Sequence, residues 1–473
     1  MNDKGVPDFP AWIGTTAQNW TWDWPHQLYL YGKLEMVTTE KTKRLMIFMP
    51  PRHSKSETVT VRYTAWRIFR EPGSNIILGC YNQRLANRFS RKIRRLVGNE
   101  IALSKERKAA DEWETIDGGS LCAVGVGAGV TGYGANLIVI DDPVKNRSEA
   151  ESKAYRENTW DWFNDDIYTR LEPNAAVILI QTRWHEDDLA GRLINESKNG
   201  GEQWEVVSLP AIAGGNAAVP AAVSGASRSR LRAGRPQDSR QDAGVTIDPL
   251  GRAPGEALCP DRSDVSALRR IEKKLGSYSF AALYQQNPVP LEGGIFKRAW
   301  FSRLVEKAPE DLKWFRGYDL AVSTRTTADH TSSVRCGMDA QGNIYIADGF
   351  RARIEYPEQR RYVIERMQEE KDTSHGVESA LHGQALVQDI LREAKLFRVV
   401  LRAIRTDTDK VTRSLLWAAK AEAGKVILVR GPWIEDFIEE VCSFPNGAHD
   451  DQIDAMSLAF RMMTERKKLS AGF

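Results

Sequence analysis

One stretch of the sequence combines residues that bind phosphate. Residues 44–49 (RLMIFM) form an apolar run that predicts a buried strand, and residues 50–57 (PPRHSKSE) lead from it into a helical segment. A strand, a tight turn, Lys-Ser and a helix are the parts of a phosphate-binding loop. Lys55 would then reach the β- and γ-phosphates of ATP, and Ser56 would hold Mg²⁺. The loop residues predicted to contact the nucleotide are Arg52, His53, Ser54, Lys55, Ser56 and Glu57.

Acidic and polar residues follow two further apolar runs. Residues 137–140 (LIVI) lead into Asp141 and Asp142, and residues 176–181 (AVILIQ) lead into Thr182. The carboxyl ends of parallel strands meet at one edge of a sheet, where α/β folds bind ligands. Asp141 is therefore predicted to hold Mg²⁺ through water and Asp142 to orient the attacking water. With another apolar run at residues 75–79 (NIILG), the pattern favours ATP hydrolysis on a parallel sheet.

Other residues near these runs have two readings each. Arg52 is placed to stabilise charge on the γ-phosphate, or is a solvent-exposed loop arginine. Gln27 is either an adenine contact or part of a helix start. A series of arginines recurs on one helical face, which contacts DNA phosphates or a neighbouring subunit, or is simply solvated. That series is Arg84, Arg88, Arg91 and Arg95.

A second constellation lies in the last third of the chain and consists of carboxylates. Asp319 stands in an apolar strand pattern, and Glu378 ends another. The segment 446–454 (NGAHDDQID) opens a helix and brings Asp450, Asp451 and Asp454 toward one face. Carboxylates that face one another are costly unless a cation neutralises them. Oxygen ligands favour Mg²⁺ or Mn²⁺, and two such ions catalyse phosphodiester cleavage.

Three alternatives bear on this metal site. N-capping of a helix explains one or two of the aspartates at 450–454, but not all five acids. Asp348 and Asp329 compete with Glu378 as the second ligand. The nearby histidines bind metal, move protons, or lie outside the ligand set; they are His375, His382 and His449.

Length and composition limit the class of protein. The chain has 473 residues, a formal charge of +3 and 42% hydrophobic residues, which exclude a polycation and a wholly disordered chain. We expect an ATPase domain at residues 1–210, a partly disordered linker or insertion at residues 211–295, and a nuclease domain at residues 296–473. The five cysteines lack metal-ligand spacing, and no apolar run is long enough to span a bilayer, so a cytosolic protein without membrane contact is predicted.

Several segments together resemble the large terminase subunit of tailed bacteriophages. They occur in family order from about residue 24 to 465, as PPRHSKSE, LIVIDDPVKN, QTRWHEDDLAGRL, LYQQNPVPLEGGIFKRAW, KVTR and FPNGAHDDQIDA. The resemblance implies an α/β fold with an N-terminal P-loop ATPase domain of the ASCE type and a C-terminal RNase H-like nuclease domain with a mixed sheet. Two residues depart from the family pattern. Ser54 replaces a common Gly, and Asp142 replaces a common Glu, so Glu149 is a second candidate for the ATPase base.

The resemblance also implies a biological role. Such a protein uses ATP and Mg²⁺, pumps double-stranded viral DNA into a procapsid and cuts it with Mg²⁺ or Mn²⁺. Its partners would be the portal protein and a small terminase subunit, and it would form a ring, commonly a pentamer, in the host cytoplasm. Thr182 would lie in the coupling motif. The alternatives are a helicase or repair ATPase with a nuclease, and a non-catalytic protein that binds the portal.

Overall fold

The computed structural model describes most of the chain in two compact units. The described residues are 5–214, 248–288, 294–321, 330–379, 381–390, 399–406, 408–447 and 449–469. One unit comprises Met1–Ile271 and Ser279–Val289, and the other Glu272–Tyr278 and Pro290–Phe473. The linker or insertion expected at residues 211–295 includes residues 215–247 and 289–293, which lie outside the described residues. So do Asp329 and the side chain of His382.

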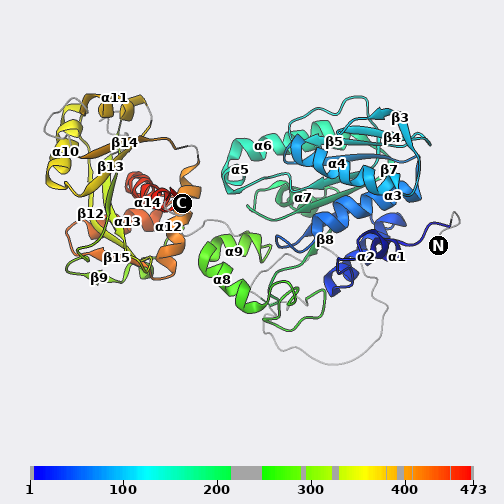
Figure 1. The fold of residues 1–473 in the computed structure, drawn as a ribbon, viewed down its shortest axis with the longest axis horizontal. Coiled ribbons are helices and arrows are strands. Elements are labelled where there is room, and N and C mark those ends of the chain that lie inside the picture. The colour runs from blue at the N-terminus through cyan, green and yellow to red at the C-terminus, as the bar shows by residue number, and fades with distance from the viewer. Residues whose placement is uncertain are drawn as a thin grey trace. The chain divides into compact units, whose positions relative to one another are not determined.

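The first unit is built on an eight-stranded sheet (Figure 1). Its order is β3-β4-β5-β2-β6-β7-β1-β8. Strands β5, β2, β6, β7, β1 and β8 pair in parallel, as predicted. Strands β3 and β4 add an antiparallel edge next to β5. The strands are β1 (Arg44–Phe48), β2 (Asn75–Cys80), β3 (Leu103–Lys108), β4 (Glu112–Thr115), β5 (Ser120–Gly125), β6 (Ala135–Asp141), β7 (Leu171–Gln181) and β8 (Glu205–Ser208).

Helices cover both faces of this sheet (Figure 1). Alternate residues of β1 enter different cores, Leu45 and Ile47 one and Met46 and Phe48 the other, as the two-residue repeat of a strand requires. The helices are α1 (Phe9–Thr16), α2 (Pro25–Thr38), η1 (Ser56–Tyr63), α3 (Thr64–Arg70), α4 (Gln83–Gly98), α5 (Arg147–Glu151), α6 (Lys153–Asp161), η2 (Trp162–Ile167), η3 (Tyr168–Arg170), α7 (Leu189–Lys198), α8 (Val265–Leu275) and α9 (Ser277–Leu283).

The second unit has a mixed sheet of order β14-β13-β10-β11-β12-β15-β9. Strands β10, β11 and β12 form an antiparallel meander, and the remaining pairs are parallel. A tight turn at residues 339–343 joins β11 to β12, and residues 320–330 join β10 to β11. The strands are β9 (Leu304–Val305), β10 (Trp314–Asp319), β11 (Thr331–Met338), β12 (Ile344–Ala352), β13 (Thr373–Glu378), β14 (Val400–Ile404) and β15 (Val426–Val429).

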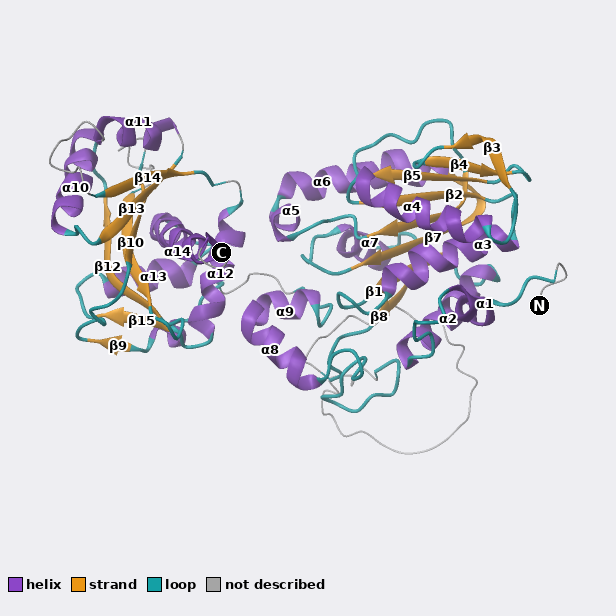
Figure 2. Ribbon diagram, in the orientation of Figure 1, coloured by secondary structure: helices purple, strands orange, loops and turns teal. Residues whose placement is uncertain are grey.

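The last helix packs closely on the centre of this sheet (Figure 2). A Cβ on Gly317 of β10 would lie 2.2 Å from the carbonyl oxygen of Ala455, so only glycine allows this approach. Tyr318 faces Tyr362 on the opposite side, and Asp319 returns to the face of Gly317. The helices are η4 (Arg298–Phe301), α10 (Tyr356–Glu369), α11 (Leu381–Ile390), α12 (Lys410–Glu422), α13 (Ile434–Ser443) and α14 (Asp451–Leu469).

No helix in the described part of the chain has both the length and the apolar character needed to cross a lipid bilayer.

Candidate active sites

The predicted phosphate loop connects β1 to helix η1 and has an unusual backbone. Arg52 and Ser54 have φ angles of 67° and 69°, in the left-handed region that glycine occupies most easily. Ser54 stands at the second glycine position of the common phosphate-loop pattern, so the loop keeps a glycine-like conformation without the glycine. The Ser54 carbonyl accepts the Thr58 N–H at 2.9 Å, which starts the helix.

The side chain of Lys55 reaches the carboxyl ends of the parallel strands β6 and β7. Its Nζ donates to Thr182 Oγ1 at 2.6 Å and lies 3.3 Å from Asp142 Oδ2. Asp142 Oδ1 in turn accepts the Thr182 N–H at 2.7 Å. The lysine side chain is buried, and this pairing compensates its charge. Residues that are far apart in the sequence therefore form one connected site.

Asp141 lies beside Lys55 and Asp142, and hydroxyl groups of helix η1 hold its carboxylate. Its two carboxylate oxygens accept the Ser56 hydroxyl at 3.1 Å and the Thr60 hydroxyl at 2.5 Å. Burial, followed by the negative charge of Asp142, raises the pKa of Asp141 to about 7. Thr60 was not anticipated, although its place one turn after Ser56 puts both hydroxyls on one helical face.

This arrangement fits a nucleotide and Mg²⁺. A cavity of about 650 Å³ adjoins the loop, and its lining includes Trp20, Trp24, Ser54, Lys55 and Arg88. That volume is in the range of small-molecule sites. The hydroxyl and carboxylate oxygens of Ser56 and Asp141 are the donor type that Mg²⁺ prefers.

The other predicted nucleotide residues have different surroundings. Arg52 is exposed and lines the cavity, whereas His53 is buried with its Nδ1 3.0 Å from the Pro51 carbonyl oxygen. Gln27 is fully buried, and its amide caps α2 by bonding the Trp24 N–H and the Thr21 carbonyl, as expected of a helix start.

Two predicted acids of this unit have local partners. Glu57 lines the cavity and pairs with Arg62 and, at 2.7 Å, with Lys92. Glu149 accepts the Lys145 N–H at 2.9 Å at the start of α5.

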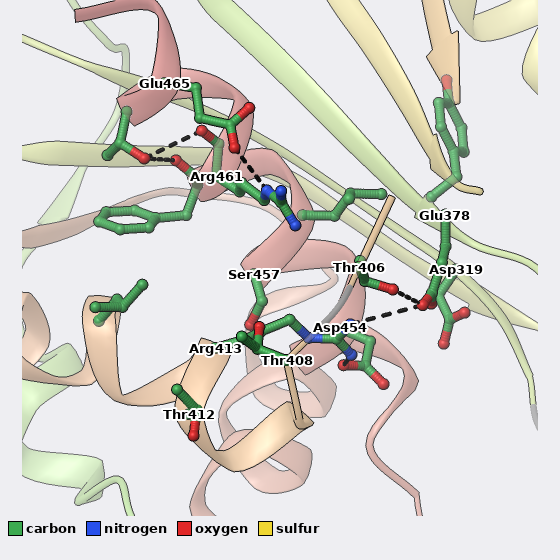
Figure 3. A pocket seen from close by; sticks show the side chains of 15 residues that line it. Asp319, Glu378, Thr406, Thr408, Thr412, Arg413, Asp454, Ser457, Arg461 and Glu465 are labelled. Atoms are coloured by element: carbon green, nitrogen blue, oxygen red, sulfur yellow. Dashed lines mark hydrogen bonds and ion pairs between the residues drawn. The ribbon is translucent and has the colours of Figure 1, made fainter. Parts of the chain in front are cut away.

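The second unit gathers three of the predicted acids around another cavity. Asp319 from β10, Glu378 from β13 and Asp454 from α14 line a space of about 300 Å³ (Figure 3). Burial raises the pKa of Asp319 well above its usual range, and the charges of Asp454, Asp451 and Glu378 raise it further. A divalent cation relieves this repulsion, so the donor set fits Mg²⁺ or Mn²⁺.

Basic and hydroxyl side chains of the next segment contact these acids. Arg413 donates to Asp454 at 2.5 Å and lies 3.6 Å from Glu378, which also accepts the Thr406 hydroxyl (Figure 3). Lys410 pairs with Asp450 at 2.5 Å. Arg461, a further cation of the lining, pairs with Glu465, so Lys410 and Arg413 are left to offset the five predicted carboxylates and the site stays negative. Thr406 was missed by sequence reasoning, and Lys410 and Arg413 were recognised only as ends of the KVTR motif.

The three aspartates near α14 point to different partners. Asp450 precedes the helix, Asp454 lines the cavity, and Asp451 is buried beside His330 and His449. Asp450, Asp451 and Asp454 therefore lie in the same region, but each contacts different side chains.

The remaining candidates near this site pair elsewhere. Asp348 forms an ion pair with the buried Arg316 at 2.6 Å, which gives it a structural partner. His375 Nδ1 lies 2.8 Å from the Tyr318 hydroxyl.

Models of known protein families match both units of the chain. Residues 46–303 match the N-terminal part of the T4likevirus-type terminase large subunit, and residues 316–463 match the terminase RNaseH-like domain. No curated protein matches the chain.

Several solved structures of large terminases are similar to this chain. The large terminase from a thermophilic bacteriophage (crystal form 2) is 9% identical with a TM-score of 0.52, over 91% of this chain and 98% of that one. The large terminase from the same bacteriophage in complex with ATP-gamma-S (crystal form 3) is 9% identical with a TM-score of 0.48, over 90% and 97%. The large terminase nuclease from thermophilic phage G20c with bound magnesium is 15% identical with a TM-score of 0.27, over 36% and 98%.

The two family matches follow one another along the chain and together cover both described units. They confirm the predicted resemblance and the predicted P-loop ATPase and RNase H-like fold. The chain belongs to the large terminase subunits, the ATPase-nuclease proteins that package viral DNA and cut it.

Proposed function

We propose that the first unit hydrolyses ATP at the loop of residues 50–57. The observation that carries this proposal is the meeting of Lys55, Thr182 and Asp142 at the ends of β6 and β7, next to the Ser56–Asp141 pair. Bound Mg²⁺ would supply charge stabilisation at the β- and γ-phosphates. Lys55 would turn from its present partners to the phosphates, and Ser56 and Asp141 would hold the ion.

The roles of the other groups follow from their positions. Asp142 is the favoured group for orienting the attacking water, because it contacts Lys55, whereas the Glu149 carboxylate caps a helix. Arg52 is exposed at the cavity and is free to approach the γ-phosphate. Thr182 touches both Lys55 and Asp142 and would couple the state of the nucleotide to β7.

The second unit is the proposed DNA-cutting unit. Asp319, Glu378 and Asp454 would hold Mg²⁺ or Mn²⁺, with Asp450 and Asp451 nearby as further acids. Bound ions would activate water and stabilise the leaving oxygen. Arg413 and Lys410 balance part of the negative charge and orient the acids.

The proposed biological setting follows from the family. The substrate is double-stranded viral DNA, and the partners are the portal protein of the procapsid and a small terminase subunit. The protein would act as a homo-oligomeric ring, commonly a pentamer, in the host cytoplasm. These assignments rest on the family membership and not on contacts within the chain.

ATP turnover by the wild type and the Lys55→Ala variant tests this proposal. The wild type should hydrolyse ATP and the variant should not, because the ammonium group that neutralises the phosphates is removed. Equal, near-zero rates would instead favour a non-catalytic assembly protein. Unwinding of a fluorescent duplex without packaging would favour a helicase.

A further inference from the structure

A buried carboxylate on α13 reaches across to the start of α14. Glu440 belongs to α13, and its side chain is 1% exposed. Its Oε1 accepts the backbone N–H of Gln452 at 2.6 Å, and its Oε2 accepts the Gln452 side-chain amide at 2.8 Å. Arg351 of β12 also donates to Oε2 at 2.8 Å. Glu440 thus joins α13, β12 and the first turn of α14 at one point.

This carboxylate serves α14 as an N-terminal cap. The first N–H groups of a helix have no acceptor within the helix, and the side chain just before the helix usually supplies one. Asp450 occupies that place, and its carbonyl oxygen accepts the N–H groups of Ile453 and Asp454, both at 3.1 Å. Its carboxylate, however, pairs with Lys410 at 2.5 Å. The Gln452 N–H is capped by a residue of another helix, 12 positions earlier in the chain.

The charge and the burial of this contact make it strong. A carboxylate at the N-terminus of a helix is favoured by the helix dipole, and a hydrogen bond to a charged group is stronger than one between neutral groups. Gln452 is 2% exposed, so water does not compete for the bond. Arg351 compensates the charge of Glu440, whose burial would otherwise be costly. The first turn of α14 is therefore fixed from outside the helix.

We propose that Glu440 is a positioning residue for the carboxylate that α14 contributes to the second cavity. Asp454 lies in the same first turn as Gln452, and it lines the cavity together with Asp319 of β10. A displacement of about 1 Å can cost a catalytic group ~100-fold in rate. The consequence for DNA cutting rests on the proposed nuclease function, whereas the capping of α14 does not.

Hydrogen exchange of the full chain without added metal tests the capping. In Glu440→Ala, the backbone amides of the first turn of α14 should exchange at least ~10-fold faster, the scale for losing a hydrogen bond to a charged group. Amides at residues 457–461, farther along the same helix, should change little. Unchanged exchange in the first turn would overturn the proposal. Equal acceleration throughout the second unit would also overturn it, because that is the mark of a merely structural residue.

Glu440→Gln provides a variant of nearly the same shape, which decides the question if Glu440→Ala does not fold. Its amide oxygen still accepts the Gln452 N–H, but its NH₂ group then faces the donors of Gln452 and Arg351. A smaller acceleration confined to the first turn is therefore expected, and none at all would overturn the proposal. Glu439→Gln changes the exposed neighbouring residue and is the matched control. It should exchange as the wild type does.

Plasmid nicking with Mn²⁺ separates the positioning role from the nuclease function itself. Glu440→Gln should lower kcat more than it raises KM for DNA, and ATP hydrolysis should stay unchanged as an internal control. Full kcat in a variant whose first turn exchanges faster would overturn the positioning role. A wild type that nicks no DNA with any divalent metal would refute the nuclease function alone, and the exchange result would still test the cap.

Discussion

The Nζ of Lys55 lies 3.3 Å from Oδ2 of Asp142, so the phosphate-loop lysine is paired with the acid that follows β6. Asp142 has a φ of 45° and also accepts the Thr182 N–H, which fixes its side chain at the end of the sheet. A phosphate that attracts Lys55 would release this carboxylate. The pair therefore links nucleotide binding to the group proposed to orient water.

Separate substitutions of Asp142 and Glu149 show which of the two is the base for ATP hydrolysis. Asp142→Asn should reduce the turnover of ATP by at least ~100-fold, the scale for loss of one oriented catalytic group. Glu149→Gln should change turnover little, because a glutamine oxygen still accepts the Lys145 N–H. Steady-state ATP hydrolysis measures both. The reverse ranking would assign the base to Glu149.

The left-handed conformation of Ser54 predicts opposite results for two substitutions. Ser54→Gly should be tolerated or slightly stabilising, since glycine has no Cβ to strain at a φ of 69°. Ser54→Val should lower the stability by ~1–2 kcal/mol and weaken ATP binding, because a left-handed β-branched residue is strained. Thermal unfolding and nucleotide titration compare the two variants. Equal stability of both would mean that the loop is not constrained at this residue.

The arrangement of the carboxylates was partly visible in the sequence. Asp319 and Glu378 each end an apolar run, and strand ends collect at a sheet edge. The charged strand β3 (LSKERK) could not be predicted from the sequence, because it lacks the apolar alternation that marks a strand.

His330 gave no sequence signal at all. It lies in the connection between β10 and β11, and its neighbours His449 and Asp451 are more than a hundred residues away in the chain. The packing of α14 on β10 and β11 brings them together. The contact of Thr406 with Glu378 has the same origin, a tertiary approach without a local pattern.

The buried His375 predicts a dependence of stability on pH. Burial lowers the pKa of His375 to about 4, below the ordinary value of 6.5, so the unfolded chain binds more protons between these values. Its contribution is therefore fully present above about pH 6.5 and is lost as the pH falls toward 4.

Comparison of the wild type with His375→Gln separates the contribution of His375 to stability from the contributions of other titratable groups. Urea unfolding should show a steeper loss of stability from pH 7 to pH 5 in the wild type than in the variant. Parallel pH dependences in the two proteins would contradict the assignment.

The arginines on α4 predict electrostatic binding of DNA. Arg84, Arg88, Arg91 and Arg95 recur along one face of the helix, and all four are exposed. If Arg91 and Arg95 contact phosphates, the double variant to alanine should weaken DNA binding and lower the salt slope by roughly one unit per lost contact.

Arg107→Ala provides the matched control for this experiment. Its guanidinium is already paired with Glu112 and Glu114. Fluorescence anisotropy at several salt concentrations measures all three proteins. An unchanged slope in the double variant would identify the face as merely solvated.

The most direct test of two separate active sites is to measure ATP hydrolysis and plasmid nicking in two variants side by side. Asp141→Asn removes an acid that Ser56 and Thr60 hold, and it should abolish ATP hydrolysis while Mn²⁺-dependent nicking persists. Asp319→Asn removes an acid that lines the cavity of the second unit and should do the reverse. Survival of both activities in both variants would contradict the account.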